Sequence, residues 1–490
     1  MSQVLDELLS PGQVLRDADS LAHWGRDWTR SFSVAPSAVV FPESIDDVQR
    51  LVQAANREGL ALVPSGGRTG LSGGAVAGNG EVVVSFDRMN RVVDFDSADR
   101  LVTCQPGVVT QVLQQYAADQ GLFYPVDFAS AGSSQIGGNI ATNAGGIKVI
   151  RHGLTRDWIA GLKVVTGAGE LLELNRGLVK NATGYDLRHL FIGSEGTLGF
   201  VVEADVALTT PPEPQLVMVL GVGRFRDLLA VLDHFQASLT LSAFEFFSEM
   251  ALQKVVEHRA LPRPLESAPP FYALIEFDDS ALDAATAAFE HCVNEGWVSD
   301  GVLSQTEAQA GKLWQLREGI SESIAGYTPY KNDLAVRISR MPEFLDQVDA
   351  LVADNYPDFE VCWYGHIGDG NLHLNILKPA DLSQQEFYDR CHSISPKIFE
   401  QVAARGGSIS AEHGVGLLKR DFLGYTRSAE EIAVMRGIKA VLDPNGIMNP
   451  GKLLRPATEH LGRASRAAWY ATSRASLSRS AAPSLRRVAP

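Results

Sequence analysis

The stretch SGGRTGLSGGAVAGNGEVVVSF, from Ser65 to Phe86, decides the fold class of the first half of this chain. It follows a β-rich run, LALVPS, and it begins with a loop dense in glycine. In a dinucleotide-binding βαβ unit, such a loop opens a helix whose N-terminus receives a pyrophosphate. Here the loop runs into EVVVSF, a second predicted strand, so we do not expect that arrangement. Glycine still lets successive backbone N–H groups turn inward, so the loop itself could bind a phosphate.

Two more glycine clusters follow, SSQIGGNIATNAGG at 133–146 and FIGSEGTLGFV at 191–201. One such cluster is equally well explained as a flexible surface loop. Three clusters in one domain, two of them within apolar sequence, favour a ligand-binding surface instead. Around them, residues 37–208 alternate short β-rich runs with helical stretches, and the helix predicted at 46–59 is amphipathic. One face of that helix carries Val48, Leu51, Val52 and Ala55.

The composition excludes some classes of protein. The formal net charge of −15 argues against a nucleic-acid-binding surface, which needs a basic field. The four cysteines are widely spaced and lack a CxxC pair, which is typical of reduced thiols in the cytoplasm. We see no signal-peptide pattern and no apolar run long enough to span a membrane. We therefore expect a cytoplasmic protein, with peripheral attachment to a membrane as the alternative.

A chain of 490 residues is too long for one core, so we predict several domains in an α+β protein. Pro211 and Pro212 mark a boundary. Beyond it, the runs QLVMVLGV, FYALIEF, LAVRI and FEVCWYGHI, with the helical stretch MPEFLDQVDALVADNY, predict a domain with a largely antiparallel sheet. The tail is rich in Ser, Ala and Arg, which predicts disorder, or contact with an acidic partner or membrane. The predicted divisions are 1–34 (helical), 35–212, 213–417, 418–455 and 456–490 (tail).

Two histidines flank a Gly-Asp-Gly turn in WYGHIGDGNLHLNIL, residues 363–377. If Asp369-Gly370 is the two-residue turn of a hairpin, then His366 faces His373, and both imidazoles lie on one side of the ribbon. Imidazoles with a carboxylate suit zinc or a similar divalent ion, and Glu412 in SAEHGVG could supply the carboxylate. The alternative is that both are ordinary hydrogen-bonded sheet residues. The cross-strand pair together with the later Glu-His pair favours a metal or catalytic site.

Several long motifs, in order, resemble the FAD-linked oxidases of the vanillyl-alcohol oxidase and p-cresol methylhydroxylase superfamily. They are PSGGRTGLSGGAV, IGGNIATNAGG, LTRDWIAGLKVVTGAGE, KNATGYDLRHLFIGSEGTLGFV and NPGKLL. The chain is most similar to the D-lactate and D-2-hydroxyglutarate dehydrogenase branch, over most of its length. The resemblance implies an FAD-binding domain of two α+β subdomains at 35–212, a cap domain with a metal site at 213–417, and a C-terminal segment at 418–455 that returns to the FAD domain.

By this resemblance, the first glycine loop holds the pyrophosphate, Glu195, Gly196 and Val201 lie near the adenine and ribose, and Asn449 reaches the isoalloxazine. Some relatives attach the flavin covalently to a histidine in the first loop. This chain has Arg68 and no histidine there, so we expect non-covalent FAD. One departure is FYPVDFAS, where the family often has Tyr-Pro-Pro-Asp-Pro. The residues expected at the FAD are Ser65, Gly66, Gly67, Arg68, Thr69, Gly70, Ser72, Gly73, Pro106, Gly107, Gly137, Gly138, Asn139, Ala141, Asn143, Gly145, Glu195, Gly196, Val201 and Asn449.

The motifs GHIGDGNLH and SAEHGVG resemble the metal and catalytic motifs of D-2-hydroxyglutarate dehydrogenases. The resemblance implies that His366, His373 and Glu412 bind a divalent metal, Zn²⁺ or else Mn²⁺, and that His413 is the catalytic base and contacts the substrate. Arg317 and Ser321, four residues apart on one predicted helix, join Lys331 and Asn375 as matches to the residues that hold the substrate's distal carboxylate.

The expected reaction is oxidation of D-2-hydroxyglutarate to 2-oxoglutarate, with D-lactate or D-malate as the alternative substrate. The resemblance implies an electron-transfer flavoprotein or a quinone-linked carrier as electron acceptor, rather than NAD, and homodimers are common among relatives. Two competing classes are a metal-dependent hydrolase that lacks flavin and an inactive flavin-binding subunit. The glycine loops argue against the hydrolase, and the intact Glu412-His413 pair argues against the inactive subunit.

Overall fold

The computed structural model describes residues 2–29 and 31–455, so the tail predicted at 456–490 lies outside the described residues. The first sheet has the strand order β1-β2-β4-β3, with β2, β4 and β3 parallel and β1 antiparallel to β2. Its strands are β1 (Val14–Leu15), β2 (Ala38–Val40), β3 (Leu62–Ser65) and β4 (Val82–Ser85). The helices beside it are α1 (Ser2–Leu8), α2 (Ala18–Trp24) and α3 (Ile45–Glu58).

Helix α3 shows why this segment is helical. Ser44 caps its N-terminus by accepting the Asp47 N–H at 3.1 Å, and Gly59 ends it with a left-handed φ of 67°. The apolar face predicted from the periodicity is buried against the sheet, which confirms the amphipathic helix.

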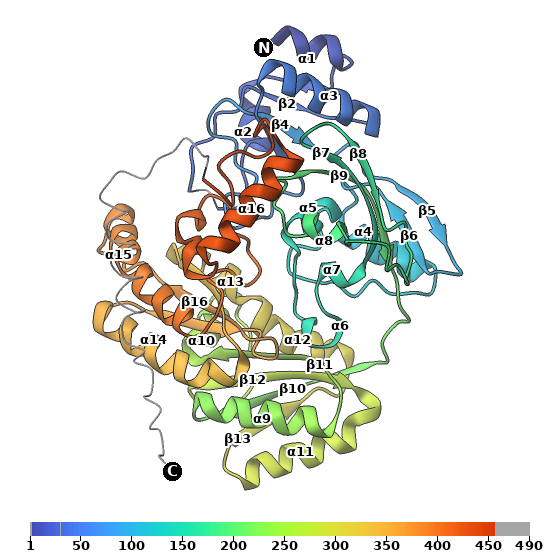
Figure 1. Cartoon of the computed structure of the whole chain (residues 1–490). Helices are drawn as coiled ribbons and strands as arrows, with labels where there is room; N and C mark the ends of the chain where they lie inside the picture. Colours follow the sequence, from blue (N-terminus) through green and yellow to red (C-terminus); the bar gives the residue numbers. More distant parts are fainter. Residues whose placement is uncertain (1, 30, 456–490) are drawn as a thin grey trace, which may run out of the picture.

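A second sheet, β5-β6-β9-β7-β8, is antiparallel throughout. Its strands are β5 (Val92–Asp96), β6 (Leu101–Cys104), β7 (Ile159–Thr166), β8 (Leu171–Leu174) and β9 (Gly199–Ala207). The helices of this region are α4 (Thr110–Asp119), α5 (Ile136–Thr142), α6 (Val149–His152), α7 (Thr155–Trp158) and α8 (Arg188–Phe191). The two sheets together form the upper part of Figure 1.

The lower part of Figure 1 is built on a seven-stranded sheet, β13-β10-β12-β11-β15-β16-β14, in which every neighbouring pair is antiparallel. This confirms the antiparallel sheet predicted for the second half. The strands are β10 (Gln215–Val222), β11 (Leu241–Ser248), β12 (Phe271–Asp278), β13 (Val298–Leu303), β14 (Tyr330–Ala335), β15 (Val361–Gly365) and β16 (Asn371–Ile376).

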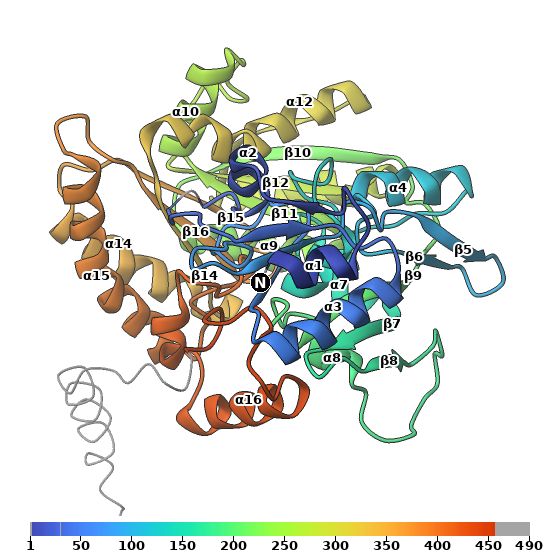
Figure 2. The same cartoon turned by 90° about the horizontal axis from the view of Figure 1, so that it is seen from above.

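Both faces of this sheet are covered, so its strands are apolar on both sides. Helices α9 (Phe225–Ser238), α11 (Leu282–Asn294), α14 (Met341–Asn355) and α15 (Gln384–Ala404) pack on one face. Helices α10 (Glu249–Arg259), α12 (Glu307–Glu318) and α13 (Ile320–Ser323) pack on the other. Figure 2 shows α14 and α15 side by side. Short 3₁₀ helices are η1 (Asp279–Ala281), η2 (Ala325–Tyr327), η3 (Ile338–Arg340) and η4 (Arg420–Tyr425).

The chain end returns to the first sheet after α16 (Ala429–Leu442). Leu62 donates its N–H to the Ile447 carbonyl at 2.8 Å, and Asn449 donates its N–H to the Leu62 carbonyl at 2.7 Å. Ile447 and Met448 are buried in the core of that sheet. The predicted divisions at 35–212, 213–417 and 418–455 remain predictions, although this return is the one that the resemblance implies.

The hairpin register predicted for the histidines is wrong by two residues. Tyr364, not His366, lies opposite His373 across β15 and β16. The turn is longer than two residues, because the His366 carbonyl accepts the N–H groups of both Asp369 and Asn371. An even shift keeps side chains on the same side of the ribbon. The two imidazoles therefore still meet, with ring centroids 5.4 Å apart.

None of the helices within residues 2–29 and 31–455 combines the length and the apolar character needed to cross a membrane.

Candidate active site

A cavity of about 1180 Å³ separates the glycine clusters from the seven-stranded sheet. All three clusters line it. It is also lined by the histidines His366, His373 and His413, by Glu412, and by the polar residues expected at the substrate. A single cavity therefore brings together segments that lie more than 300 residues apart in the chain.

The glycine clusters wrap this cavity because their backbones pack too closely for side chains. A Cβ on Gly67 would lie 2.1 Å from the Ser133 carbonyl oxygen, and one on Gly137 would lie 2.6 Å from Pro106 Cβ. Gly138 is different: it lines the cavity, and a Cβ there would meet nothing within 4 Å. The first two glycines join the loops to one another, whereas Gly138 leaves free space for a ligand. This backbone cradle fits a dinucleotide such as FAD.

Most of the residues expected at FAD line the cavity. They are Gly66, Gly67, Arg68, Thr69, Gly70, Ser72, Pro106, Gly137, Gly138, Asn139, Ala141, Gly145, Glu195, Gly196 and Val201. Ser65, Gly73, Gly107, Asn143 and Asn449 do not.

Asn449 and Glu195 hold the loops together. The Asn449 amide donates to the carbonyls of Gly74 at 2.9 Å and Glu195 at 2.7 Å, and the residue is fully buried. It supports the cavity wall from behind, whereas we expected it to reach into the cavity. The Glu195 carboxylate accepts the N–H groups of Val415 and Gly416, each at 2.7 Å. This ties the third glycine cluster to the segment that carries Glu412.

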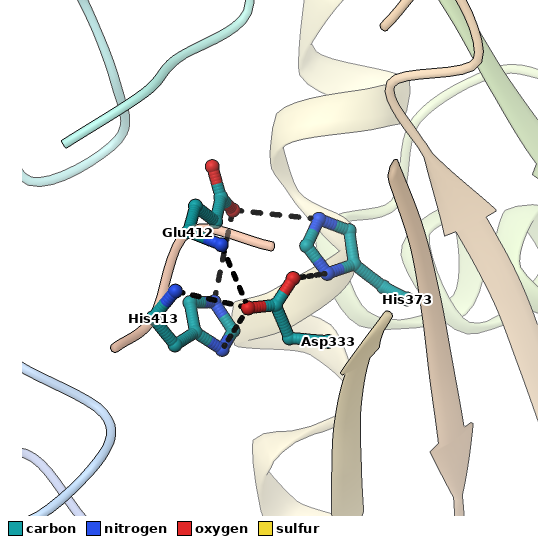
Figure 3. A group of neighbouring side chains, drawn as sticks. All are labelled: Asp333, His373, Glu412 and His413. Carbon is teal, nitrogen blue, oxygen red and sulfur yellow. Dashed lines mark hydrogen bonds and ion pairs between the residues drawn. The ribbon is translucent and has the colours of Figure 1, made fainter. Parts of the chain in front are cut away.

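Three imidazoles converge on one carboxylate oxygen. Glu412 Oε1 lies 3.9 Å from His366 Nε2, 3.6 Å from His373 Nε2 and 3.7 Å from His413 Nε2. Figure 3 shows Glu412 facing His373 and His413. The arrangement offers three nitrogen donors and a carboxylate, which is the donor chemistry of a zinc or similar divalent site.

Asp333 on β14 lies behind two of these rings, and the sequence analysis did not select it. Its carboxylate is 3.8 Å from His373 Nδ1 and 3.7 Å from His413 Nδ1. It also accepts the backbone N–H groups of Glu412 at 3.0 Å and His413 at 2.9 Å. Glu245 on β11 takes the same place behind the third ring, 2.8 Å from His366 Nδ1. Each imidazole therefore has a carboxylate at Nδ1 and turns Nε2 toward Glu412.

One signal in the sequence could have revealed Glu245. It stands in β11, which is apolar apart from Glu245 and two serines, and a buried charge needs a partner. Asp333 follows Lys331 and Asn332 in β14, so the sequence carries no such signal for it. A tight group of possible ligands contains Asp333, His373, Glu412 and His413, whose candidate atoms all lie within 4.8 Å of one another. His366, an expected ligand, lies outside this group.

Burial and neighbouring charges shift the pKa values in this cluster. Burial lowers the pKa of His413 to about 4, even though Asp333 lies beside it. Burial raises the pKa of Glu412 to about 7. Burial would also lower the pKa of His366, but the Glu245 carboxylate outweighs it and raises that pKa to about 9. For Asp333, burial is outweighed by its basic neighbours, first His413, which is protonated in acid, and then Lys419, so the pKa of Asp333 lies well below the usual range. His413 is thus a neutral imidazole at neutral pH.

The predicted helix carrying Arg317 and Ser321 is interrupted. Helix α12 ends at Glu318 and α13 begins at Ile320, although Gly319 keeps right-handed angles (φ −67°, ψ −15°). Both side chains still line the same cavity, as do Lys331 and Asn375.

The two cations at this end of the cavity differ in their partners. Lys331 Nζ donates to Ser321 Oγ at 3.0 Å, and burial lowers its pKa. Within the described part of the chain, no carboxylate oxygen lies within 4.0 Å of that ammonium. Arg317, in contrast, pairs with Glu245 through Nη2 and Oε2 at 2.7 Å and stacks over Tyr364, 4.8 Å from the ring centroid. Of the described residues at this end of the cavity, Lys331 is therefore the cation without an acidic partner, whereas Arg317 already shares its charge with Glu245.

Comparison with known proteins agrees with these features. Residues 36–175 match the FAD binding domain family, and residues 211–453 match the C-terminal domain of the FAD linked oxidases. The fold is similar to that of a solved p-cresol methylhydroxylase with substrate bound (TM-score 0.74, 14% identity, covering 94% of this chain and 97% of that one). The fold and the cavity thus define an FAD-dependent oxidoreductase.

Curated relatives identify the family within this class of oxidoreductase. A D-2-hydroxyglutarate dehydrogenase of Stutzerimonas stutzeri is 60% identical over 92% of this chain and 97% of its own length. One of Xanthomonas citri pv. viticola is 57% identical over 88% of this chain and 92% of its own length. The chain belongs to the D-2-hydroxyglutarate dehydrogenase family of FAD-linked oxidases.

Proposed function

We propose that this protein oxidises D-2-hydroxyglutarate to 2-oxoglutarate with FAD as the immediate electron acceptor. One observation carries the proposal: a single cavity joins a dinucleotide cradle, a cluster of imidazoles around a carboxylate, and a half-buried ammonium with no acidic partner among the described residues. The cradle suits a flavin, and the imidazole cluster suits a metal ion that binds the hydroxy acid. The ammonium suits a second carboxylate of the substrate. The names of the relatives support the same substrate.

Residues His366, His373 and Glu412 would hold a divalent ion, Zn²⁺ or else Mn²⁺, and the buried Asp333 and Glu245 would orient the rings. When bound, FAD would accept the hydride from C2, and the ion would lower the pKa of the 2-hydroxyl.

His413 would accept the hydroxyl proton at Nε2. Its lowered pKa leaves the ring neutral, and the Asp333 carboxylate beside Nδ1 favours the tautomer with hydrogen on Nδ1. The backbone N–H of His413 is bound to the same carboxylate, which fixes the position of the ring. His413 would thereby take the hydroxyl proton, and bound FAD would supply the hydride acceptor that the conversion of the alcohol to the 2-oxo acid needs.

Lys331, Ser321, Asn375 and Arg317 would hold the distal carboxylate of the substrate. Lys331 is the strongest candidate because it lines the cavity, is half-buried and lacks a carboxylate partner among the described residues. Arg317 would share its guanidinium between the substrate and Glu245. For the electron acceptor we propose an electron-transfer flavoprotein or a quinone-linked carrier, and for the assembly a homodimer, both on the family resemblance.

The test of the function is anaerobic mixing of the purified protein with a panel of acids while flavin absorbance is recorded. D-2-Hydroxyglutarate should bleach the flavin faster than D-malate or D-lactate, and L-2-hydroxyglutarate should not bleach it. Reduction by D-lactate at an equal or higher rate would transfer the assignment to the lactate branch. Protein without flavin absorbance would support the hydrolase, and flavin that no acid reduces would support the inactive subunit.

We predict that the FAD is not covalently attached. The first glycine loop carries Arg68, whose Nη1 donates to the Gly66 carbonyl at 2.8 Å and lies 3.4 Å from Asp87. A guanidinium in these contacts is no nucleophile for the flavin. Acid precipitation should release all the yellow colour into the supernatant. Colour retained in the washed pellet would contradict the prediction.

We predict that Lys331→Met lowers kcat/KM for D-2-hydroxyglutarate on the order of 10- to 100-fold and leaves D-lactate turnover nearly unchanged. A charge-assisted contact to a carboxylate contributes about 1.5–3 kcal/mol, and only the longer acid has a distal carboxylate. Lys331→Met is a cleaner test of this site than Arg317→Ala. Removal of the Arg317 side chain would also leave Glu245 without its ion pair to that residue.

The matched control is Lys312→Met, which removes an exposed lysine from α12. It should leave both substrates unaffected. Equal losses on both acids in Lys331→Met would show that this ammonium binds the carboxylate next to C2, and the distal assignment would then fail.

A further inference from the structure

Glu245 is an unusual residue for its surroundings. It stands in the middle of β11, a strand in which every residue is buried, and its own side chain is 2% exposed. A carboxylate is costly to bury unless charged or hydrogen-bonding groups compensate it. Glu245 must therefore be explained by its contacts.

Those contacts join two residues with different proposed roles. Oxygen Oε1 lies 2.8 Å from Nδ1 of His366, and oxygen Oε2 lies 2.7 Å from Nη2 of Arg317. His366 belongs to the imidazole cluster, whereas Arg317 belongs to the end of the cavity that would hold the distal carboxylate. Neither Nε nor Nη2 of Arg317 has a hydrogen-bond partner among the described residues, so the contact with Glu245 is an ion pair that does not saturate the guanidinium.

We propose that Glu245 is a positioning residue that couples the distal-carboxylate site to the metal site. The proposal rests on the proposed function. A carboxylate is rigid, so its two oxygens cannot move independently. When an anion binds Arg317, it takes over part of the positive charge that Glu245 now shares. Glu245 is then more fully available to His366, whose Nε2 becomes a better metal donor. Because linkage is reciprocal, a bound metal should tighten a dicarboxylate to the same extent.

This coupling gives Glu245 a part in choosing the substrate. An acid with a distal carboxylate would improve the metal site that its own hydroxyl needs. A monocarboxylic acid such as D-lactate cannot reach Arg317 in this way and would gain nothing. The length of the substrate would therefore affect the affinity of the metal site as well as the contact with Lys331.

The neighbouring strand supplies a matched control. Glu276 on β12 is 4% exposed, accepts a hydrogen bond from Trp314 Nε1 at 2.8 Å and pairs with Lys148 at 3.0 Å. Like Glu245, Glu276 is a buried carboxylate of this sheet. Each of the two contacts a residue of α12: Glu276 contacts Trp314, and Glu245 contacts Arg317. It contacts no residue of the imidazole cluster.

The experiment measures Zn²⁺ affinity of the FAD-loaded enzyme by competition with a chromophoric chelator. In Glu245→Gln we expect the affinity to fall about 10- to 100-fold, as for other residues that orient metal-binding histidines. Glu276→Gln should stay within about twofold of the wild type. Glu245→Asp, which keeps the charge, should recover part of the loss and provides a second variant if the glutamine protein does not fold.

The second measurement repeats this titration with glutarate, a dicarboxylate without a hydroxyl group, and with acetate. In the wild type, glutarate should tighten Zn²⁺ about fivefold or more, within the usual range of coupling between sites, and acetate should not. In Glu245→Gln the effect of glutarate should disappear, whereas in Glu276→Gln it should persist.

Unchanged Zn²⁺ affinity in Glu245→Gln, equal losses in both glutamine variants, or a glutarate effect that survives in Glu245→Gln would each overturn the proposal. Failure of the proposed function would look different. The wild-type flavin would then not be reduced by D-2-hydroxyglutarate, whereas the Zn²⁺ comparison would still report on Glu245.

Discussion

Replacement of His413 by asparagine should lower the rate of flavin reduction by D-2-hydroxyglutarate on the order of 10²- to 10⁴-fold, the usual contribution of a general base. His413 is suited to this role because burial lowers its pKa to about 4 and the Asp333 carboxylate lies 3.7 Å behind Nδ1. Asparagine keeps a polar side chain but provides no basic nitrogen. D-Lactate should suffer equally, because both acids need their hydroxyl deprotonated. The measurement is anaerobic stopped-flow absorbance at saturating substrate.

Two further observations make this result specific. FAD content should be unchanged, since His413 is not part of the glycine clusters that form the proposed FAD cradle. Metal content should also be largely retained, because the proposed ligands His366, His373 and Glu412 are unchanged. This measurement separates a base from a ligand, which is needed because His413 is one of the four residues whose candidate atoms lie within 4.8 Å of one another. The control is His392→Asn, which replaces an exposed histidine on α15 and should leave the rate of flavin reduction unchanged. A His413→Asn enzyme within tenfold of the wild-type rate would exclude the proposed base.

Replacement of His373 by alanine should remove the metal and, with it, most of the activity. His373 is the centre of the cluster: its Nε2 lies 3.6 Å from Glu412, its Nδ1 lies 3.8 Å from Asp333, and it is buried. Losing a direct ligand should weaken the metal by more than about 100-fold, the upper range for residues that only orient ligands. Without the ion the hydroxyl keeps its ordinary high pKa, so flavin reduction should fall at least on the order of 100-fold.

Elemental analysis after dialysis, beside the flavin spectrum, checks this prediction. His373→Ala should contain FAD but no stoichiometric metal, and His392→Ala should contain both. If His373→Ala keeps full metal occupancy, the histidines are structural and the ion binds elsewhere or not at all. His366→Ala should give the same result in weaker form, since His366 lies outside the tightest group of ligand atoms.

Local patterns in the sequence were sufficient for much of the fold. The periodicity at 46–59 predicted a helix that is present with the expected buried face, because one apolar stripe can be buried in only one way. The glycine loop that leads to Glu81–Phe86 excluded a βαβ nucleotide site, and the chain there does form a strand, β4. The antiparallel sheet of the second half was also predicted, since its strands are separated by turns and by amphipathic helices.

The errors came from details that local patterns do not determine. The Asp369-Gly370 turn was counted as a two-residue turn, but Gly370 packs against Val336, where a Cβ would lie 2.4 Å from the carbonyl oxygen. The turn extends from His366 to Asn371, which moves the register by two residues. The expected single helix is divided at Gly319, where a Cβ would lie 2.6 Å from the Gln315 carbonyl oxygen. Periodicity reports neither the length of a turn nor an interruption at a single residue.

By itself the sequence predicted which residues would carry the chemistry: the glycines of the three clusters, the histidines, Glu412 and the cations of the cavity. These residues are recognisable because each type has a property that few others share. Glycine lacks a Cβ, histidine offers a neutral nitrogen donor, and the acidic and basic side chains carry a charge. Only the tertiary structure decided their partners. Asp333 and Glu245 stand behind the imidazoles because β14 and β11 lie beside the hairpin of β15 and β16, an order of strands that no local pattern records. The partner of a buried carboxylate cannot be read from the spacing of residues in the sequence. The energy of the pair depends on distances of about 3 Å between segments that are remote in the chain.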